Sequence, residues 1–416
     1  MSVTGFLFST RHLWLWILLM VWWLMPQALA QDVSITALFK PDPTQPHLNQ
    51  FKNTTPPSGY CERYPGQCVE NQTFSLQVPI QFESSQAIPA NHGSPRQGAT
   101  FRVPAQWREL TVRHESGAVE TVKMRITGIG SKYVTEDVRQ LTGDTNEDYR
   151  FAHNLLWGLS WVNSPAPCLY SGVGYYGTNY YGFFWKTPVE AACNKQAKFQ
   201  VPWMRYEFLD FAYELFTPNP LGMLAGHYTG SLTYTVGPNG DFDFGDVMLP
   251  SSPILTMNFN LDVQHTLKVD VPPGGEKVQL LPAGGWQSWL HAGRKPARLF
   301  RDQTFNISAS SRFKMFLQCS ITDGRVCYMA DRNLILTAPL KVSVSLPGGL
   351  TNSAGRPVQR QELLTEGGSE IFQPGHYVDR KPGTLHFELE KPDHLFLPGA
   401  PKQYFGSVTV IWDSEV

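Results

Sequence analysis

Short runs in which apolar and polar residues alternate dominate this sequence, and they limit its fold more than any other feature. Alternation with a period of two is the pattern of a β-strand with one buried face. Glycine and proline, 35 and 32 of the 416 residues, separate the runs. The runs are 74–82, 110–114, 119–126, 231–236, 255–271, 304–308, 313–321, 334–346, 384–389 and 405–412. This pattern predicts an all-β chain of sandwiches or barrels, with two short helices at 146–156 and 204–216.

The final run, 405–412, ends four residues before the end of the sequence. One face of it would carry Tyr404, Val408, Val410 and Trp412, with Gly406 among them. Because termini fray unless a sheet holds them, we expect this strand to close a domain. The simpler explanation, that many β-domains end in a strand, stays open.

The first 30 residues have the pattern of a secretory signal peptide. A basic flank at Arg11 precedes an uncharged apolar run at 13–25, and the small residues Ala28 and Ala30 follow in an A-x-A cleavage motif. The apolar run is shorter than the about 20 residues that a membrane span needs. We predict cleavage after Ala30, which leaves 416 − 30 = 386 residues; an uncleaved anchor is the alternative.

Composition narrows the class of protein. The formal net charge is −1 without long runs of one sign, which argues against a nucleic-acid partner. Aromatic residues make up 13% and charged residues only 17% of the chain, which favours β-structure and contact surfaces. The length suits two β-sandwich domains. We expect them at 31–245 and 246–416, with a polar, proline-rich arm at 31–59.

Six cysteines form three pairs of near neighbours in the sequence. Six cysteines allow 15 pairings, and local pairing is the simplest for an exported β-protein. No spacing indicates a metal site, so we expect no metal. The expected disulfides are Cys61–Cys68, Cys168–Cys193 and Cys319–Cys327.

Catalytic motifs are weak. Residues 172–177 match G-x-G-x-x-G, but no flanking strand and helix of a dinucleotide fold is predicted, so we expect no cofactor. Asp241 and Asp243 would share one strand face, as paired carboxylates of a glycoside hydrolase do. A solvated strand edge explains them better, and we expect no enzyme.

A loop rich in aromatic residues and glycine is the best candidate for ligand contact. Tyrosine and tryptophan present flat apolar faces with a polar tip, which suits sugars and recognition surfaces in general. The alternative is that half of these rings belong to an ordinary core. The candidates are Tyr175, Tyr176, Tyr180, Tyr181 and Trp185.

Three passages give the chain a resemblance to a known family. They are 35–43 with 53–61, 228–237 with 241–246, and the final strand at 404–412. In these passages the chain resembles the minor, adhesin-like subunits of bacterial chaperone–usher fimbriae, over most of its length.

This resemblance implies immunoglobulin-like sandwiches, of which the C-terminal, pilin-like one has an incomplete sheet. A periplasmic chaperone, and then another fimbrial subunit, would supply the missing strand by strand addition. The groove would be bordered by Tyr404, Val408, Val410 and Trp412. An outer-membrane usher would be a further partner, and the fimbrium on the cell surface the destination, reached through the periplasm.

These expectations combine into a fimbrial tip or minor subunit. Its N-terminal domain would bind a receptor such as a glycan, and its C-terminal domain would join the fibre by donor-strand complementation. The family's receptor sites vary, so the resemblance implies none here. A secreted β-sandwich glycoside hydrolase and a structural adaptor without a ligand are the alternatives.

Overall fold

The structure, a computed structural model, describes residues 30–292, 295–365, 370–397 and 403–414. Strands are far more extensive than helices in the described residues, so the all-β prediction is confirmed. The predicted signal peptide lies outside the described residues, apart from Ala30. No helix in the described part combines the length and apolar character of a membrane span.

The first group of strands forms a thirteen-stranded sheet and a separate pair, β5 with β10. At the centre of the sheet, β7 pairs with β6, β9, β11 and β12. The strands are β1 Gln31–Phe39, β2 Lys52–Asn53, β3 Phe74–Val78, β4 Phe82–Ser84, β5 Ala99–Phe101, β6 Arg108–His114, β7 Val119–Val134, β8 Leu169–Tyr176, β9 Tyr180–Lys186, β10 Cys193–Lys195, β11 Arg205–Tyr206, β12 Leu209–Phe216, β13 Gly226–Thr235, β14 Met248–Pro250 and β15 Ile254–Val263. The helices are α2 Tyr60–Arg63, α3 Pro65–Asn71, η1 Pro95–Gln97, α4 Val138–Thr142, α5 Tyr149–Trp157 and η2 Pro220–Gly222.

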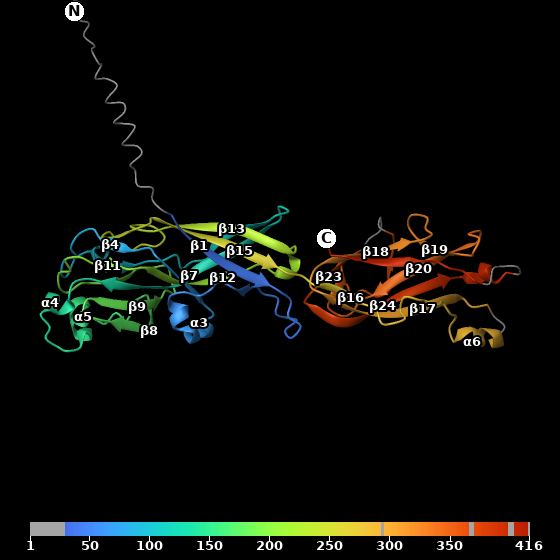
Figure 1. The fold of residues 1–416 in the computed structure, drawn as a ribbon, viewed down its shortest axis with the longest axis horizontal. Coiled ribbons are helices and arrows are strands. Elements are labelled where there is room, and N and C mark those ends of the chain that lie inside the picture. Colours follow the sequence, from blue (N-terminus) through green and yellow to red (C-terminus); the bar gives the residue numbers. More distant parts are fainter. Residues whose placement is uncertain (1–29, 293–294, 366–369, 398–402, 415–416) are drawn as a thin grey trace, which may run out of the picture.

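The second group forms a sandwich of two sheets around its own core. One sheet has the order β16-β17-β24-β20-β19, with β22 also on β20, and the other has the order β21-β23-β18-β25. The elements are β16 Leu267–Asp270, α6 Gly285–Ala292, β17 Arg298–Ala309, β18 Phe313–Cys319, β19 Cys327–Ala330, β20 Thr337–Ser345, β21 Leu350–Asn352, β22 Gln361–Leu363, β23 Glu370–Pro374, β24 Val378–Glu390, η4 Pro392–Phe396 and β25 Val408–Asp413. The two groups lie end to end, with α4 and α5 at the far end of the first (Figure 1).

The arm expected at 31–59 is instead built into the first sheet. β1 pairs in parallel with β15, from Gln31 opposite Leu255 to Phe39 opposite Val263, and antiparallel with β2. Alternate residues of β1, ending with Ile35, Ala37 and Phe39, are buried in the first core. The expectation of a separate arm was wrong, because apolar residues at every second position let this segment cover the core.

The same pairing moves the boundary between the two halves. β15 pairs with β13 and β1, and its residues Met257 and Phe259 belong to the first core. The predicted division at 245/246 therefore falls before two strands of the first sheet. We propose residues 264–266, between β15 and β16, as the boundary of two domains with separate cores.

One of the two predicted helices exists. α5 begins after Asp148, whose carboxylate accepts the backbone N–H of Arg150 as an N-cap. The helix predicted at 204–216 is wrong, because this segment forms β11 and β12. Five consecutive residues of β12, from Leu209 to Tyr213, are buried, so the strand lacks the alternation that identifies a half-exposed strand.

Candidate functional site

The last strand, β25, lies at the edge of its sheet. It pairs antiparallel with β18, from Val408 opposite Cys319 to Asp413 opposite Lys314, and no described strand pairs with its other side. In the facing sheet β16 is also an edge strand, paired only with β17 among the described strands. Backbone groups along both edges are therefore available to a further strand.

An apolar groove with a volume of about 300 Å³ lies between these two edges. Val408, Val410 and Trp412 of β25 line one side, and the chain from β16 onward lines the other. The ring centroid of Trp412 is 4.9 Å from that of Phe305 on the groove floor. The other lining residues are Val269, Val271, Gly275, Glu276, Val278, Leu280, Gln303, Met329, Leu340, Leu385, Phe387 and Gly406. Such a groove exposes apolar side chains that a strand could cover.

Three of the four residues predicted for the groove edge line this groove. The fourth, Tyr404, does not, because the chain before β25 turns to another strand. There Phe405 and Ala330 exchange two backbone hydrogen bonds of 2.8 Å. The Tyr404 hydroxyl is buried, and no described group bonds to it. That a donor strand enters this groove stays a prediction.

Two of the five predicted ligand contacts belong to the core. Tyr181 is 2% exposed, and its hydroxyl lies 2.8 Å from the Ser160 hydroxyl. Trp185 is fully buried, and its indole N–H donates to the Trp161 carbonyl at 2.7 Å. Neither side chain can reach a ligand in this structure. The reason is geometric: β9 packs against β7 and carries buried side chains from Tyr181 to Trp185.

The other three tyrosines lie at the ends of β8 and β9 that adjoin the hairpin turn. The β8–β9 hairpin lies beside α5 (Figure 1). The Tyr175 hydroxyl accepts a hydrogen bond of 3.2 Å from the Arg63 guanidinium. Tyr176 is 37% exposed, and Tyr180 is half-buried with its ring 5.4 Å from the Lys132 ammonium. Their contact with a receptor stays a prediction. The glycine motif at 172–177 covers the end of β8 and the first residue after it, and strand β9 follows instead of a helix.

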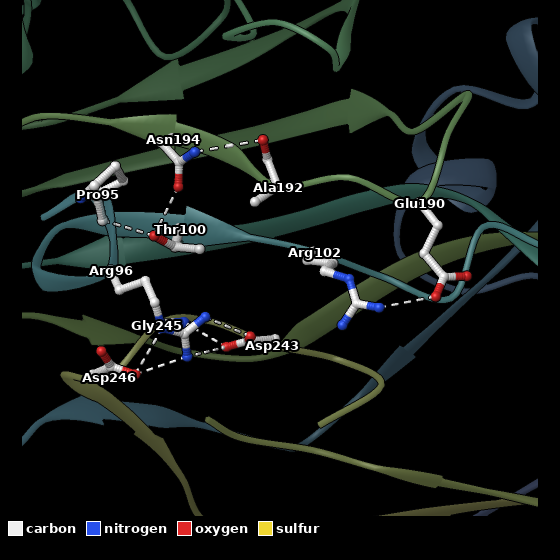
Figure 2. A network of polar contacts seen from close by, with 10 residues as sticks. All are labelled: Pro95, Arg96, Thr100, Arg102, Glu190, Ala192, Asn194, Asp243, Gly245 and Asp246. Carbon is white, nitrogen blue, oxygen red and sulfur yellow. Dashed lines mark hydrogen bonds and ion pairs between the residues drawn. The ribbon is translucent and has the colours of Figure 1, made fainter. Parts of the chain in front are cut away.

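The two carboxylates considered for hydrolysis are engaged in ion pairs. Asp243 is 3% exposed, and its Oδ2 lies 2.7 Å from Nη1 of Arg96 (Figure 2). Its Oδ1 also accepts the Gly245 N–H at 2.9 Å. Asp241 accepts two hydrogen bonds from Thr235 and pairs with Arg108 at 3.3 Å. Carboxylates held by several donors fix loops, and this is the role the geometry gives them.

The covalent predictions can be compared directly. The structure contains the disulfides Cys61–Cys68, Cys168–Cys193 and Cys319–Cys327. Cys61–Cys68 joins α2 to α3. Among the described residues no group of three His, Cys, Asp or Glu side chains could hold a metal ion.

Sequence reasoning missed the floor of the groove. Phe305 and Leu385 come from predicted strands, at 304–308 and 384–389, and their alternation indicated one buried face. Alternation shows that a strand has a buried face but not which strand covers that face. The groove beside β25 could therefore not be predicted from the sequence. Only the pairing order of the two sheets reveals it.

No family model and no curated protein matches the sequence. Solved structures resemble the chain at low identity. A chaperone–tip adhesin complex of CFA/I fimbriae matches at 9% identity and a TM-score of 0.24, covering 94% of this chain and 98% of the other. CfaE, the adhesive subunit of CFA/I fimbria of enterotoxigenic Escherichia coli, matches at 10% and 0.24, covering 92% of each.

A third structure is the CsuC–CsuE chaperone–tip adhesion subunit pre-assembly complex of archaic chaperone–usher Csu pili of Acinetobacter baumannii. It matches at 8% identity and a TM-score of 0.20, covering 93% of this chain and 98% of the other. At these TM-scores the likeness supports no conclusion about function. The groove beside β25 is the stronger guide.

Proposed function

We propose that this chain is a tip or minor subunit of a chaperone–usher fimbria. Its second domain would join the fibre by accepting a donor strand beside β25, and its first domain would bind a surface receptor. A periplasmic chaperone, an outer-membrane usher and other fimbrial subunits would be its partners. The chain would be exported through the periplasm to the cell surface.

The groove is the observation that carries this proposal. Two edge strands, β16 and β25, border one apolar strip, and the side chains of Val408, Val410 and Trp412 are only half-buried. An added strand would bond to the β25 backbone and place alternate side chains in the groove. An exposed edge of this kind also promotes aggregation, so a chain that carries it needs a partner.

The pairing of β1 favours a tip position. An internal subunit must offer a strand to its neighbour. Here the segment Gln31–Phe39 is already paired in its own sheet with β15 and β2. That segment is therefore not available as a donor strand.

Receptor binding would fall to the first domain. Tyr175, Tyr176 and Tyr180 remain candidates for contact, since they adjoin the turn of the β8–β9 hairpin. That hairpin lies beside α5, at the end of the first domain away from the second (Figure 1). A glycoside hydrolase is a weaker hypothesis, because Asp241 and Asp243 are held in ion pairs. The other alternative, a structural adaptor without a ligand, would join the fibre in the same way but bind no receptor.

Co-purification tests the assembly role. The full-length chain is produced in the periplasm alone and together with the chaperone of a fimbrial operon. We expect it to aggregate or dimerise alone and to form a one-to-one complex with the chaperone. A chain that is monodisperse and stable alone and does not bind the chaperone would contradict the proposal.

A further inference from the structure

A second pocket, here called the α3 pocket, lies on the first domain where α3 meets β7, β9 and β12. Its volume is about 140 Å³. Pockets for drug-sized ligands measure about 300–1,000 Å³, so this one suits a smaller group. Its floor is apolar and its rim is polar. The floor consists of Tyr60, Phe184 and Ala212, and the rim of Asn71, Thr73, Thr127, Lys186 and Glu214.

A β-bulge places one rim residue. In the β7–β12 ladder Ala212 pairs with Gly128 and Tyr213 pairs with Ile126, so Thr127 is an extra residue with no partner on β12. Bulges re-aim a side chain and are frequent beside functional sites. The Thr127 hydroxyl lies 3.0 Å from the Thr73 hydroxyl across the pocket rim.

The end of α3 places two more rim residues. Gln72, the C-cap, has φ 51° in the left-handed region, which is unusual for a residue other than glycine. Asn71 and Thr73 flank it, and the Thr73 N–H donates to the Cys68 carbonyl at 3.0 Å. The Cys61–Cys68 disulfide holds this helix to α2. A bulge, a left-handed cap and a disulfide thus converge on one small pocket.

The rim keeps unused hydrogen-bonding capacity of both kinds. The Thr73 hydroxyl lies 3.2 Å from the Tyr213 carbonyl, which can only accept, and 3.0 Å from the Thr127 hydroxyl. When Thr73 donates to that carbonyl, Thr127 donates to Thr73 and its lone pairs remain free to accept. The Lys186 ammonium donates to Asn71 Oδ1 at 3.1 Å, and no described carboxylate pairs with it. Two of its three N–H groups can therefore donate to a ligand.

Glu214 adds acceptor capacity. Its Oε2 is occupied by the Arg125 guanidinium, at 2.6 Å and 2.8 Å, which leaves Oε1 for another donor. A sugar hydroxyl both donates and accepts, so neighbouring hydroxyls match a rim on which Lys186 donates while Glu214 and Thr127 accept. The C–H face of a sugar ring would meet the apolar floor.

We propose that the α3 pocket is the subsite for one hexose ring of a receptor glycan. This inference rests on the proposed adhesin function and gives its receptor a chemical class and a location. Lys186 is the principal donor to the sugar hydroxyls. Thr127 and Glu214 are the acceptors.

An array of immobilised hexose-terminated glycans, together with matrix proteins free of glycan, tests this with the full-length chain bound to its chaperone. Lys186→Met and Thr127→Val each remove one rim contact while keeping similar volume. We expect each to weaken glycan binding about tenfold, the loss typical of one good hydrogen bond to a charged or fixed group. Lys123→Met is the matched control and should leave binding unchanged, because Lys123 is a half-exposed lysine of β7 that pairs with Glu109 and does not line the pocket.

Thermal melting confirms that each variant folds. If Thr127→Val does not fold, Asn71→Ala at an exposed position replaces it. The inference is overturned if no glycan binds, if the rim variants bind as tightly as the parent chain, or if only Tyr176→Ala on the hairpin weakens binding. A chain that binds the chaperone but no glycan contradicts this inference alone, whereas failure to bind the chaperone contradicts the assembly role.

Discussion

Replacing Val410 with aspartate distinguishes a groove that receives a strand from one that stays empty. Val410 lines the groove and is half-buried, so a carboxylate there can still reach water while the groove is unfilled. We expect the substitution to lower the free energy of unfolding of the chain by only about 1 kcal/mol.

Strand addition changes the surroundings of that carboxylate. A strand lying over the groove would exclude water, and the described lining includes Glu276 but no lysine, arginine or histidine to neutralise the charge. An unpaired buried charge costs several kcal/mol. Taking about 3 kcal/mol, at about 1.4 kcal/mol for each factor of ten, the affinity for the strand donor falls about 100-fold.

The assay measures the dissociation constant of the full-length chain and its chaperone, with the amount of chain in sheared fimbriae as a second readout. Thr409→Asp is the control, because Thr409 is the next residue on β25 but is exposed and faces away from the groove. We expect Thr409→Asp to change the affinity by less than about twofold. Equal effects of the two substitutions, or full affinity of Val410→Asp, would refute the reasoning.

Three further predictions concern the first domain. Burial raises the pKa of Asp210 from 3.8 to about 7, so the folded chain holds this proton more tightly and loses stability as the pH rises from about 4 to 7. Urea unfolding at pH 5 and 7.5 should show that Asp210→Asn removes this loss, and an unchanged pH dependence would contradict it. Trp185→Ala should lower the free energy of unfolding by about 3–5 kcal/mol and Tyr176→Ala by less than about 1 kcal/mol. Equal losses would contradict the assignment of Trp185 to the core and Tyr176 to the surface. Asp243→Asn should cost about 3 kcal/mol, partly recovered when Arg96→Met is added, in thermal melts; a stable Asp243→Asn chain that loses polysaccharide hydrolysis would instead support an enzyme.

Local patterns predicted the strands well where one face is buried. β15 shows the strict alternation of Leu255, Met257 and Phe259, and the segment was predicted as a strand. β12 was mistaken for a helix because residues on both of its faces are buried. The same limit applies to the aromatic loop, where the sequence alone cannot distinguish Trp185 in the core from Tyr176 on the surface.

Features that depend on distant pairing could not be predicted. The predicted division at 245/246 lies earlier than the proposed boundary at 264–266, because the link between β14 and β15, rich in proline and serine, looks like a linker. β15, which follows this link, belongs to the first sheet because it pairs with β1, more than two hundred residues away in the sequence. The groove and the α3 pocket also arise where distant segments meet, and no single stretch of sequence describes either.

The parallel pairing of β1 with β15 has a consequence for the order of folding. Gln31 lies opposite Leu255, a separation of 255 − 31 = 224 residues. Because synthesis starts at the N-terminus, β1 is made long before β15. The two strands can pair only after nearly the whole first domain has been synthesised. Closing so long a loop makes folding slow. The first domain can therefore complete its sheet only late in synthesis, and until then the edge of its first strand is open to pairing with other chains.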